Sequence, residues 1–259
     1  MTSFRFRLSS LLRRMLPPDL MRRLSAELWL ERTAGGRILG GPFAGMRLAP
    51  GTAHWNLHAQ LAGTYELELH PWIRELASRH FDGHVHVGAV EGHYVVGLAM
   101  MSRPDKSVAF EMNLDGQHMI IENAKANGVD EPIEVFGKAA TAELQAALQC
   151  FPAPLLVIDV EGAEDWLLDP ATVPALASTT ILVEIHHWIR EGFTPELLDR
   201  FSLSHDIRTV DSRPRTIADL PVAPPCFLRT CRPRALQRLV EENRGPFMQW
   251  ALMTPLRKG

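Results

Sequence analysis

Short apolar runs alternate along this chain with segments in which apolar residues recur every three or four positions. The first pattern indicates strands buried in a sheet, and the second indicates helices packed against it. The pattern predicts strands from 84 to the glycine at 88 and at 106–111, 132–136, 155–158, 180–185, 205–210 and 247–253. Helices are predicted at 94–101, 113–127, 141–151 and 194–201, with Thr194 as a helix N-cap and a helix-rich segment at 59–80 that Pro71 divides.

Strands that alternate with helices at this spacing are joined by right-handed crossovers. The sequence therefore predicts an α/β fold with a mostly parallel, doubly wound sheet and helices on both faces. The last strand follows a long excursion, and we expect it to insert antiparallel beside the strand before it. That excursion, residues 212–245, contains five prolines and a predicted short helix at 234–243. It is either a lid over the site or a surface connector.

The N-terminal segment differs from the rest of the chain. Residues 1–58 are predicted to form a basic helical appendage, followed by a main domain at 59–259. Residues 1–37 contain eight arginines and three acids, and apolar residues recur at helical spacing between 8 and 15 before Pro17 and Pro18. A second helix is expected from Asp19, as its N-cap, to about Glu31. Such a segment either caps the domain or makes weak contact with an anionic membrane surface.

Composition narrows the class of protein. The chain has 259 residues, of which 46% are hydrophobic and 22% charged, as in ordinary soluble domains. The formal net charge of −3 argues against a protein that binds nucleic acid over its whole surface. Three scattered cysteines suit neither a disulfide framework nor a zinc site, which favours reduced thiols in the cytoplasm. The sequence contains no run of eighteen apolar residues, so no membrane-spanning helix is predicted.

Candidate chemistry gathers at the predicted carboxyl ends of the strands, where open α/β sheets bind ligands. Gly88 and Gly92 bracket a tight turn in which missing Cβ atoms let the backbone approach a ligand. Glu111 ends the second strand, where a carboxylate can accept hydrogen bonds from both ribose hydroxyls. The sequence therefore suggests a nucleoside site, although a purely steric strand-to-helix turn explains the same glycines. Further polar residues end the other strands: His86, Asp159, Glu161, Glu164, Glu184, His186 and His187.

The segment Leu155–Glu164, with the sequence LLVIDVEGAE, resembles the signature of the FkbM-type family of S-adenosylmethionine-dependent methyltransferases. Residues 87–94, 108–111 and 182–186 are similar to the family's first motif, its ribose-binding strand and its fifth strand, so the resemblance covers about residues 60–210. It implies the class I methyltransferase fold, with seven strands and an antiparallel last strand. It also implies cofactor contacts by Gly88 and Gly92 at the methionyl part, Glu111 at the ribose and Ala139 near the adenine, with Asp159 near the reacting methyl group.

The resemblance implies methyl transfer, for which we expect the hydroxyl of a small molecule or of a glycan as the acceptor. A hydroxyl acceptor needs a base, and His186 and His187 are the candidates, although both also suit structural roles. Strand alternation allows only one of them to face the cleft, with Glu184 on the same side as His186. Asp159, Glu184 and His186 are also ligand types that suit Mn²⁺, although carboxylates end strands for other reasons.

One residue departs from the family pattern. The family usually has an acid two residues before the first motif glycine, whereas this chain has His86. Glu91, inside the turn, is the candidate to replace that negative charge. If it does not, the chain is a non-catalytic relative that keeps the fold as a binding or scaffold module. A nicotinamide-dependent oxidoreductase is a weaker alternative, because the spacing Gly-x-x-x-Gly is not the dinucleotide-binding pattern. The oligomeric state stays open.

Overall fold

The computed structural model describes residues 25–242 and 248–256, which fall into two compact units. The helical unit contains the described residues of 25–45, 54–67 and 214–242, and the sheet unit contains 46–53, 68–213 and 248–256. Part of the predicted appendage and most of the predicted lid or connector thus belong to one unit. The helix predicted at 8–15 and the N-cap predicted at Asp19 lie outside the described residues.

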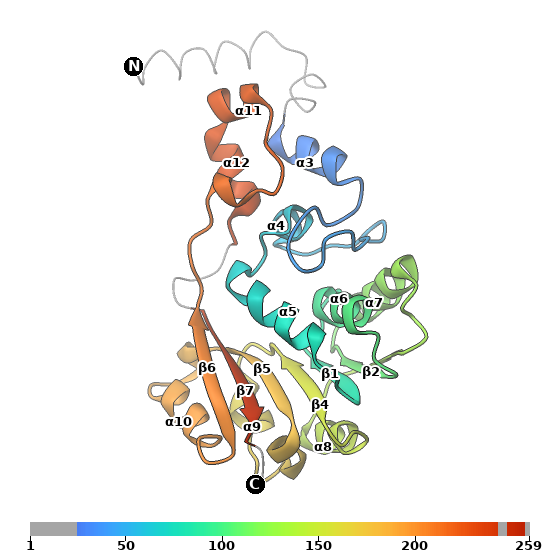
Figure 1. The fold of residues 1–259 in the computed structure, drawn as a ribbon, viewed down its shortest axis with the longest axis vertical. Helices are drawn as coiled ribbons and strands as arrows, with labels where there is room; N and C mark the ends of the chain where they lie inside the picture. The colour runs from blue at the N-terminus through green and yellow to red at the C-terminus, as the bar shows by residue number, and fades with distance from the viewer. Residues whose placement is uncertain (1–24, 243–247, 257–259) are drawn as a thin grey trace. The chain divides into compact units, whose positions relative to one another are not determined.

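The sheet unit is built on one seven-stranded sheet (Figure 1). Its strand order is β3-β2-β1-β4-β5-β7-β6, and β7 runs antiparallel to both of its neighbours. The predictions of a mostly parallel sheet and of an inserted antiparallel last strand are therefore confirmed. The strands are β1 Gly83–Val87, β2 Ser107–Phe110, β3 Ile133–Phe136, β4 Pro154–Ile158, β5 Thr180–Ile185, β6 His205–Asp211 and β7 Gln249–Pro255.

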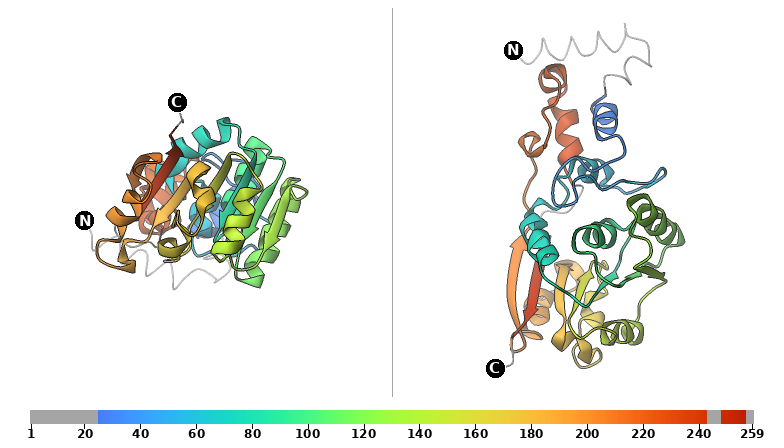
Figure 2. Two further views of the ribbon diagram at one scale, coloured as in Figure 1. Left: turned by 90° about the horizontal axis from the view of Figure 1, so that it is seen from below. Right: turned by 45° about the vertical axis from the view of Figure 1, so that its right-hand side comes forward.

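Helices cover both faces of this sheet, as Figures 1 and 2 show. The central strands are therefore buried on both sides. The helices on one face are α5 His70–Ser78, α6 His93–Ser102 and α7 Leu114–Asn127. Those on the other face are α8 Thr141–Gln149, α9 Glu164–Leu167 and α10 Phe193–Asp199. Val85 and Val87 of β1 belong to the apolar core under α8 and α10. The alternating residues His84 and His86 therefore point to the face of α5, α6 and α7.

Helix ends follow the sequence signals in one case and not in another. Helix α7 starts after Asn113, whose side chain accepts a hydrogen bond from Asp115 N, and ends at left-handed Gly128, so the helix predicted at 113–127 is confirmed. Helix α10 starts earlier than expected. Its N-cap is Gly192, at a φ of 76°, so the N-cap predicted at Thr194 is wrong. The left-handed Gly192 forms the turn before the helix, so the helix begins earlier than the Thr-Pro pair indicates.

The helical unit contains α3 Ala26–Ala34, α4 Leu57–Ala62, α11 Cys226–Cys231 and α12 Pro233–Val240, of which α11 was not predicted. A buried ion pair joins Arg215 to Glu242, with Nη2 and Oε1 at 2.7 Å. The three cysteines are exposed and free. Among the described helices, none combines the length and the apolar character that crossing a bilayer requires.

Candidate active site

The carboxyl ends of β1 and β4 meet at the point where the strand order reverses. From β1 the chain proceeds to β2 and β3 on one side, whereas β4 and β5 lie on the other. In this register Val87 pairs with Ile158, so the next residues, Gly88 and Asp159, leave the sheet side by side. Asp159 N also donates a hydrogen bond to Val87 O, at 3.0 Å. Crevices at such reversal points are where open α/β sheets bind their ligands.

The turn after β1 depends on glycine at both ends. Gly88 has a φ of 76°, and a Cβ atom placed on it would lie 1.7 Å from the carbonyl oxygen of Asp159. Gly92 has a φ of 92° and is the N-cap of α6. Between them Val90 has a φ of 48°, which is a rare and strained conformation for a β-branched residue. The sequence predicted the two glycines, but it carried no signal for the strain at Val90.

Glu111, directly after β2, is hydrogen-bonded to this turn. Its Oε2 accepts from Val90 N at 2.8 Å, and its Oε1 accepts from Asn113 N at 2.7 Å. Gly116 of α7 packs against it, since a Cβ there would lie 2.8 Å from both Glu111 Cγ and Val90 O. Each carboxylate oxygen retains a second lone pair. The carboxylate is therefore fixed in place and can still accept hydrogen bonds from a ligand.

His86 is buried on β1, and neither of its ring nitrogens has a hydrogen-bond partner among the described residues. Burial, and then the neighbouring His84, lower the pKa of His86 well below its usual value. Burial also lowers the pKa of His84, to about 4. His86 is therefore a neutral imidazole at pH 7. Glu91, in the turn, is also buried, and its backbone carbonyl accepts a hydrogen bond from Asn123 Nδ2 at 2.8 Å.

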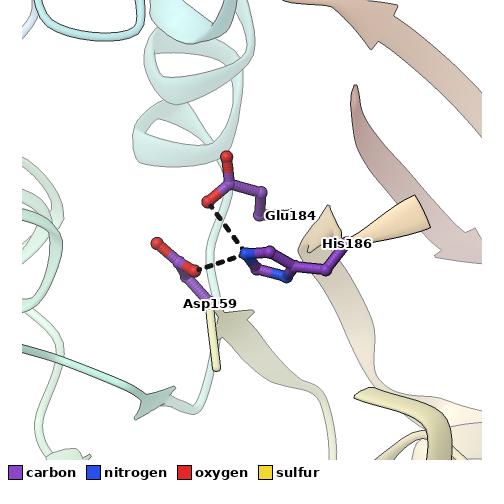
Figure 3. Close-up of side chains that lie close together, drawn as sticks. All are labelled: Asp159, Glu184 and His186. Carbon is purple, nitrogen blue, oxygen red and sulfur yellow. Dashed lines mark ion pairs between the residues drawn. The ribbon is translucent and has the colours of Figure 1, made fainter. Parts of the chain in front are cut away.

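His186, one residue past β5, is the centre of a carboxylate cluster (Figure 3). The side chain is fully buried, and Nδ1 is hydrogen-bonded to Glu164. Nε2 lies 3.3 Å from Glu161, 3.6 Å from Asp159 and 3.9 Å from Glu184. Burial acts to lower the pKa of His186, but the bond to Glu164 and the surrounding carboxylates outweigh it and raise that pKa.

The register explains why these residues meet. Ile158 pairs with Val183, so Asp159 stands beside Glu184 at the next position. His186 shares the side of Glu184, whereas His187 is exposed, so the alternation predicted from the sequence is confirmed. The loop after Asp159 turns sharply at Glu161 (φ 50°) and Gly162 (φ 117°). Helix α9 then starts at Glu164 and brings that side chain to His186. The sequence placed the acids at this edge but did not pair Glu164 with His186.

The predicted site residues thus form two neighbouring groups. Gly88, Gly92 and Glu111 belong to the turn after β1, and Asp159 and His186 belong to the carboxylate cluster. The steric contact between Gly88 and Asp159 joins the two groups. Ala139 is buried between β3 and α8, two strands away from β1 in the sheet.

No protein-family model matches the chain, and no curated protein matches it. Among solved structures, the chain is similar to an S-adenosylmethionine-dependent O-methyltransferase from Thermotoga maritima, at 13% identity over 75% of this chain and 67% of that chain, with a TM-score of 0.45. A Streptococcus pneumoniae protein solved in complex with S-adenosyl-L-methionine has 13% identity over 73% of this chain and 72% of that chain, with a TM-score of 0.46. The precorrin 8W decarboxylase of Methanobacterium thermoautotrophicum has 16% identity over 79% and 91%, with a TM-score of 0.43.

The order of the seven strands, with its single antiparallel strand between β5 and β6, defines the architecture. This chain has the Rossmann-like class I methyltransferase fold.

Proposed function

We propose that this protein is an S-adenosylmethionine-dependent methyltransferase of the FkbM type, which methylates a hydroxyl of a small molecule or of a glycan. The observation that carries the proposal is the turn from Gly88 to Gly92, bonded to the carboxylate of Glu111 and in contact with Asp159 at the strand-order reversal. Fold alone does not define an activity, so the proposal depends on these residues.

The residues at this edge suit such a cofactor. Glu111 is held by two backbone amides and keeps lone pairs for the two ribose hydroxyls. Gly88 and Gly92 leave the backbone of the turn open to the methionyl part. Ala139, a small buried residue at the start of α8, is the proposed neighbour of the adenine. Asp159 Oδ1 is a buried oxygen with no hydrogen-bond partner in the described chain, which suits a role beside the reacting group.

His86 does not exclude this cofactor. Because its pKa is lowered, it adds no positive charge beside a sulfonium. A neutral imidazole can donate one hydrogen bond and accept another, and both ring nitrogens are available for this. We propose that Glu91 supplies the missing negative charge. If so, Glu91→Gln weakens cofactor binding in a calorimetric titration, and an unchanged affinity would rule that role out.

When bound, the cofactor would supply an electrophilic methyl group, with its sulfur as the leaving group that takes both electrons of the C–S bond. The chain contributes alignment, which in favourable cases is worth about 7–11 kcal/mol. His186 and Asp159 are the proposed catalytic residues, since an imidazole and a carboxylate that lie 3.6 Å apart at this edge of the sheet can take up a hydroxyl proton. The bond from Nδ1 to Glu164 fixes the imidazole so that Nε2 points into the site.

Calorimetric titration with S-adenosylmethionine, its demethylated product and NAD tests the cofactor. We expect the first two to bind and NAD not to bind. Glu111→Gln should weaken binding about 10- to 150-fold, because hydrogen bonds to a charged group are worth about 1.5–3 kcal/mol. The control is Glu122→Gln, an exposed acid on α7. Thermal melts show whether each variant is folded. If the protein freed of carried-over ligand binds neither compound, the enzyme proposal fails.

A second candidate function is a non-catalytic binding or scaffold protein with the same fold. Its support is His86 at the position of the family's acid. Under this alternative, His86→Asp should raise the affinity for S-adenosylmethionine, because it restores a carboxylate where the parent has none. A parent protein that already binds the cofactor and methylates a hydroxyl acceptor would exclude the alternative. A cytoplasmic location remains a prediction from the cysteines.

A further inference from the structure

The arrangement around His186 has an electrostatic feature that the proposed methyl transfer leaves unexplained. His186 Nδ1 is hydrogen-bonded to Glu164, so the other ring nitrogen, Nε2, faces the opposite way. That atom is buried and has no hydrogen-bond partner within the described chain. It nevertheless points at oxygens of Asp159 and Glu184, as Figure 3 shows. Carboxylates that converge on one buried atom repel one another unless a positive charge lies between them.

Among the residues that the structure describes, no arginine or lysine supplies that charge to Asp159, Glu161 or Glu164. Within residues 25–242 and 248–256, the ion pairs of Asp159, Glu161 and Glu164 all run to His186. The arginines that follow the cluster in sequence, Arg190 and Arg200, are bound by Asp165 and Glu196. Several carboxylates therefore surround one imidazole.

We propose that Asp159, Glu184 and His186 bind one divalent cation, with Mn²⁺ as the best match to the ligand set. One imidazole nitrogen and two carboxylates suit a first-row metal better than Mg²⁺, which prefers oxygen ligands alone. Glu164 then has the supporting role that carboxylates have beside metal-bound histidines. It fixes the tautomer and the orientation of the ring.

The distances fit a single ion. Ligand atoms that lie about 2.0–2.2 Å from a metal are at most about 4.4 Å from one another. Nε2 of His186 lies 3.6 Å from Asp159 Oδ1 and 3.9 Å from Glu184 Oε2. All three ligand atoms lie within 4.8 Å of one another, so binding requires a closure of a few tenths of an ångström. Asp159 Oδ1 is itself buried without a hydrogen-bond partner.

The site is closed on one side and open on the other. The side chains of His186 and Glu184 are 0% and 2% exposed, whereas those of Asp159 and Glu161 are 26% and 66% exposed. The open side leaves coordination positions for an acceptor oxygen, as catalytic metal sites do. The cation would lower the pKa of the acceptor hydroxyl. With Nε2 bound to the cation, His186 is not the base; the hydroxyl proton would pass to Glu161 as the O–H bond breaks, and the oxygen would bond to the methyl carbon while the C–S electron pair goes to sulfur. This catalytic role rests on the proposed function, whereas the existence of the site does not.

The test is a titration of the full chain with Mn²⁺ after treatment with EDTA and dialysis, followed by calorimetry and by electron paramagnetic resonance of free Mn²⁺. We expect one site per chain that binds Mn²⁺ at least 10-fold more tightly than Mg²⁺. Asp159→Asn and Glu184→Gln should each weaken it at least 10-fold, and Glu164→Gln should weaken it 10- to 100-fold. The matched control is Glu191→Gln, an exposed acid five residues after His186, which should bind as the parent does.

Each outcome decides the proposal. Absence of a stoichiometric site overturns it, and so does equal Mn²⁺ binding by the parent and the folded cluster variants. Asp159→Asn keeps the test valid if the buried variants do not fold, because Asp159 is partly exposed. A titration with S-adenosylmethionine on the same samples separates the two proposals. Cofactor binding without Mn²⁺ binding overturns only the cation site, and Mn²⁺ binding without cofactor binding overturns only the enzyme.

Discussion

Replacing Gly88 by alanine tests whether the close approach of two backbones builds the site. The position combines two separate penalties. Its φ of 76° is left-handed, which costs an L-residue about 1–2 kcal/mol, partly offset by about 0.4–1 kcal/mol from a more restricted unfolded chain. The new Cβ would also lie 1.7 Å from Asp159 O, whereas real Cβ atoms essentially never approach within 3.0 Å, so one backbone segment must move by more than 1 Å.

A matched variant separates these penalties. Gly128→Ala has a similar φ of 66°, but a Cβ there meets nothing within 4 Å. It should therefore lose only the conformational part, about 1 kcal/mol. Overpacking a well-packed site typically adds about 1–3 kcal/mol, so Gly88→Ala should lose about 2–4 kcal/mol. Since each kcal/mol lowers the Tm of a domain this size by about 2–4 °C, we expect shifts of about 2–4 °C for Gly128→Ala and about 4–16 °C for Gly88→Ala.

Scanning calorimetry of the parent and both variants measures these shifts, with far-UV circular dichroism as a check that each is folded. If Gly88→Ala melts as high as Gly128→Ala, the contact with Asp159 does not constrain the turn and does not join the two groups of site residues. If Gly88→Ala folds but has moved Asp159, it should also bind Mn²⁺ more weakly than Gly128→Ala does.

Two further predictions concern the strand and the turn. Val90→Asn should raise the free energy of unfolding by about 1 kcal/mol, because asparagine tolerates the left-handed φ of 48°. Urea denaturation measures this change, and an unchanged free energy of unfolding would mean that the packing of Val90 outweighs its strain. The buried His84 has a pKa of about 4 in the folded protein and about 6.5 in the unfolded chain. Between these two pH values the unfolded chain binds more protons than the folded protein does. The free energy of unfolding therefore has its full value above pH 6.5 and falls as the pH is lowered toward 4. One such group changes the free energy of unfolding by at most about 1.4 kcal/mol per pH unit. Urea denaturation between pH 7 and pH 5 should therefore show a weaker pH dependence of this free energy for His84→Leu than for the parent. An equal pH dependence would mean that burial does not lower the pKa of His84.

The sequence by itself determined the elements and their types. Apolar runs such as 155–158 can be satisfied only inside a sheet covered on both faces, so their alternation with helical segments predicted the architecture. Capping chemistry is equally local, and Asn113 and Gly128 cap the helix that was predicted at 113–127. It failed at Thr194, because the left-handed Gly192 starts α10 two residues earlier.

Tertiary structure decided what depends on neighbouring strands and turns. Glu164 and His186 are 22 residues apart, and only the register of β4 against β5 and the sharp turn at Glu161 bring them together. The unpartnered Nε2 of His186 likewise exists only because Glu164 occupies the other nitrogen. The left-handed Val90 has no local signal, since its amide is held by Glu111, a residue 21 positions away. Periodicity and capping act over one or two turns of chain, whereas a binding site is formed by contacts that only the assembled sheet creates.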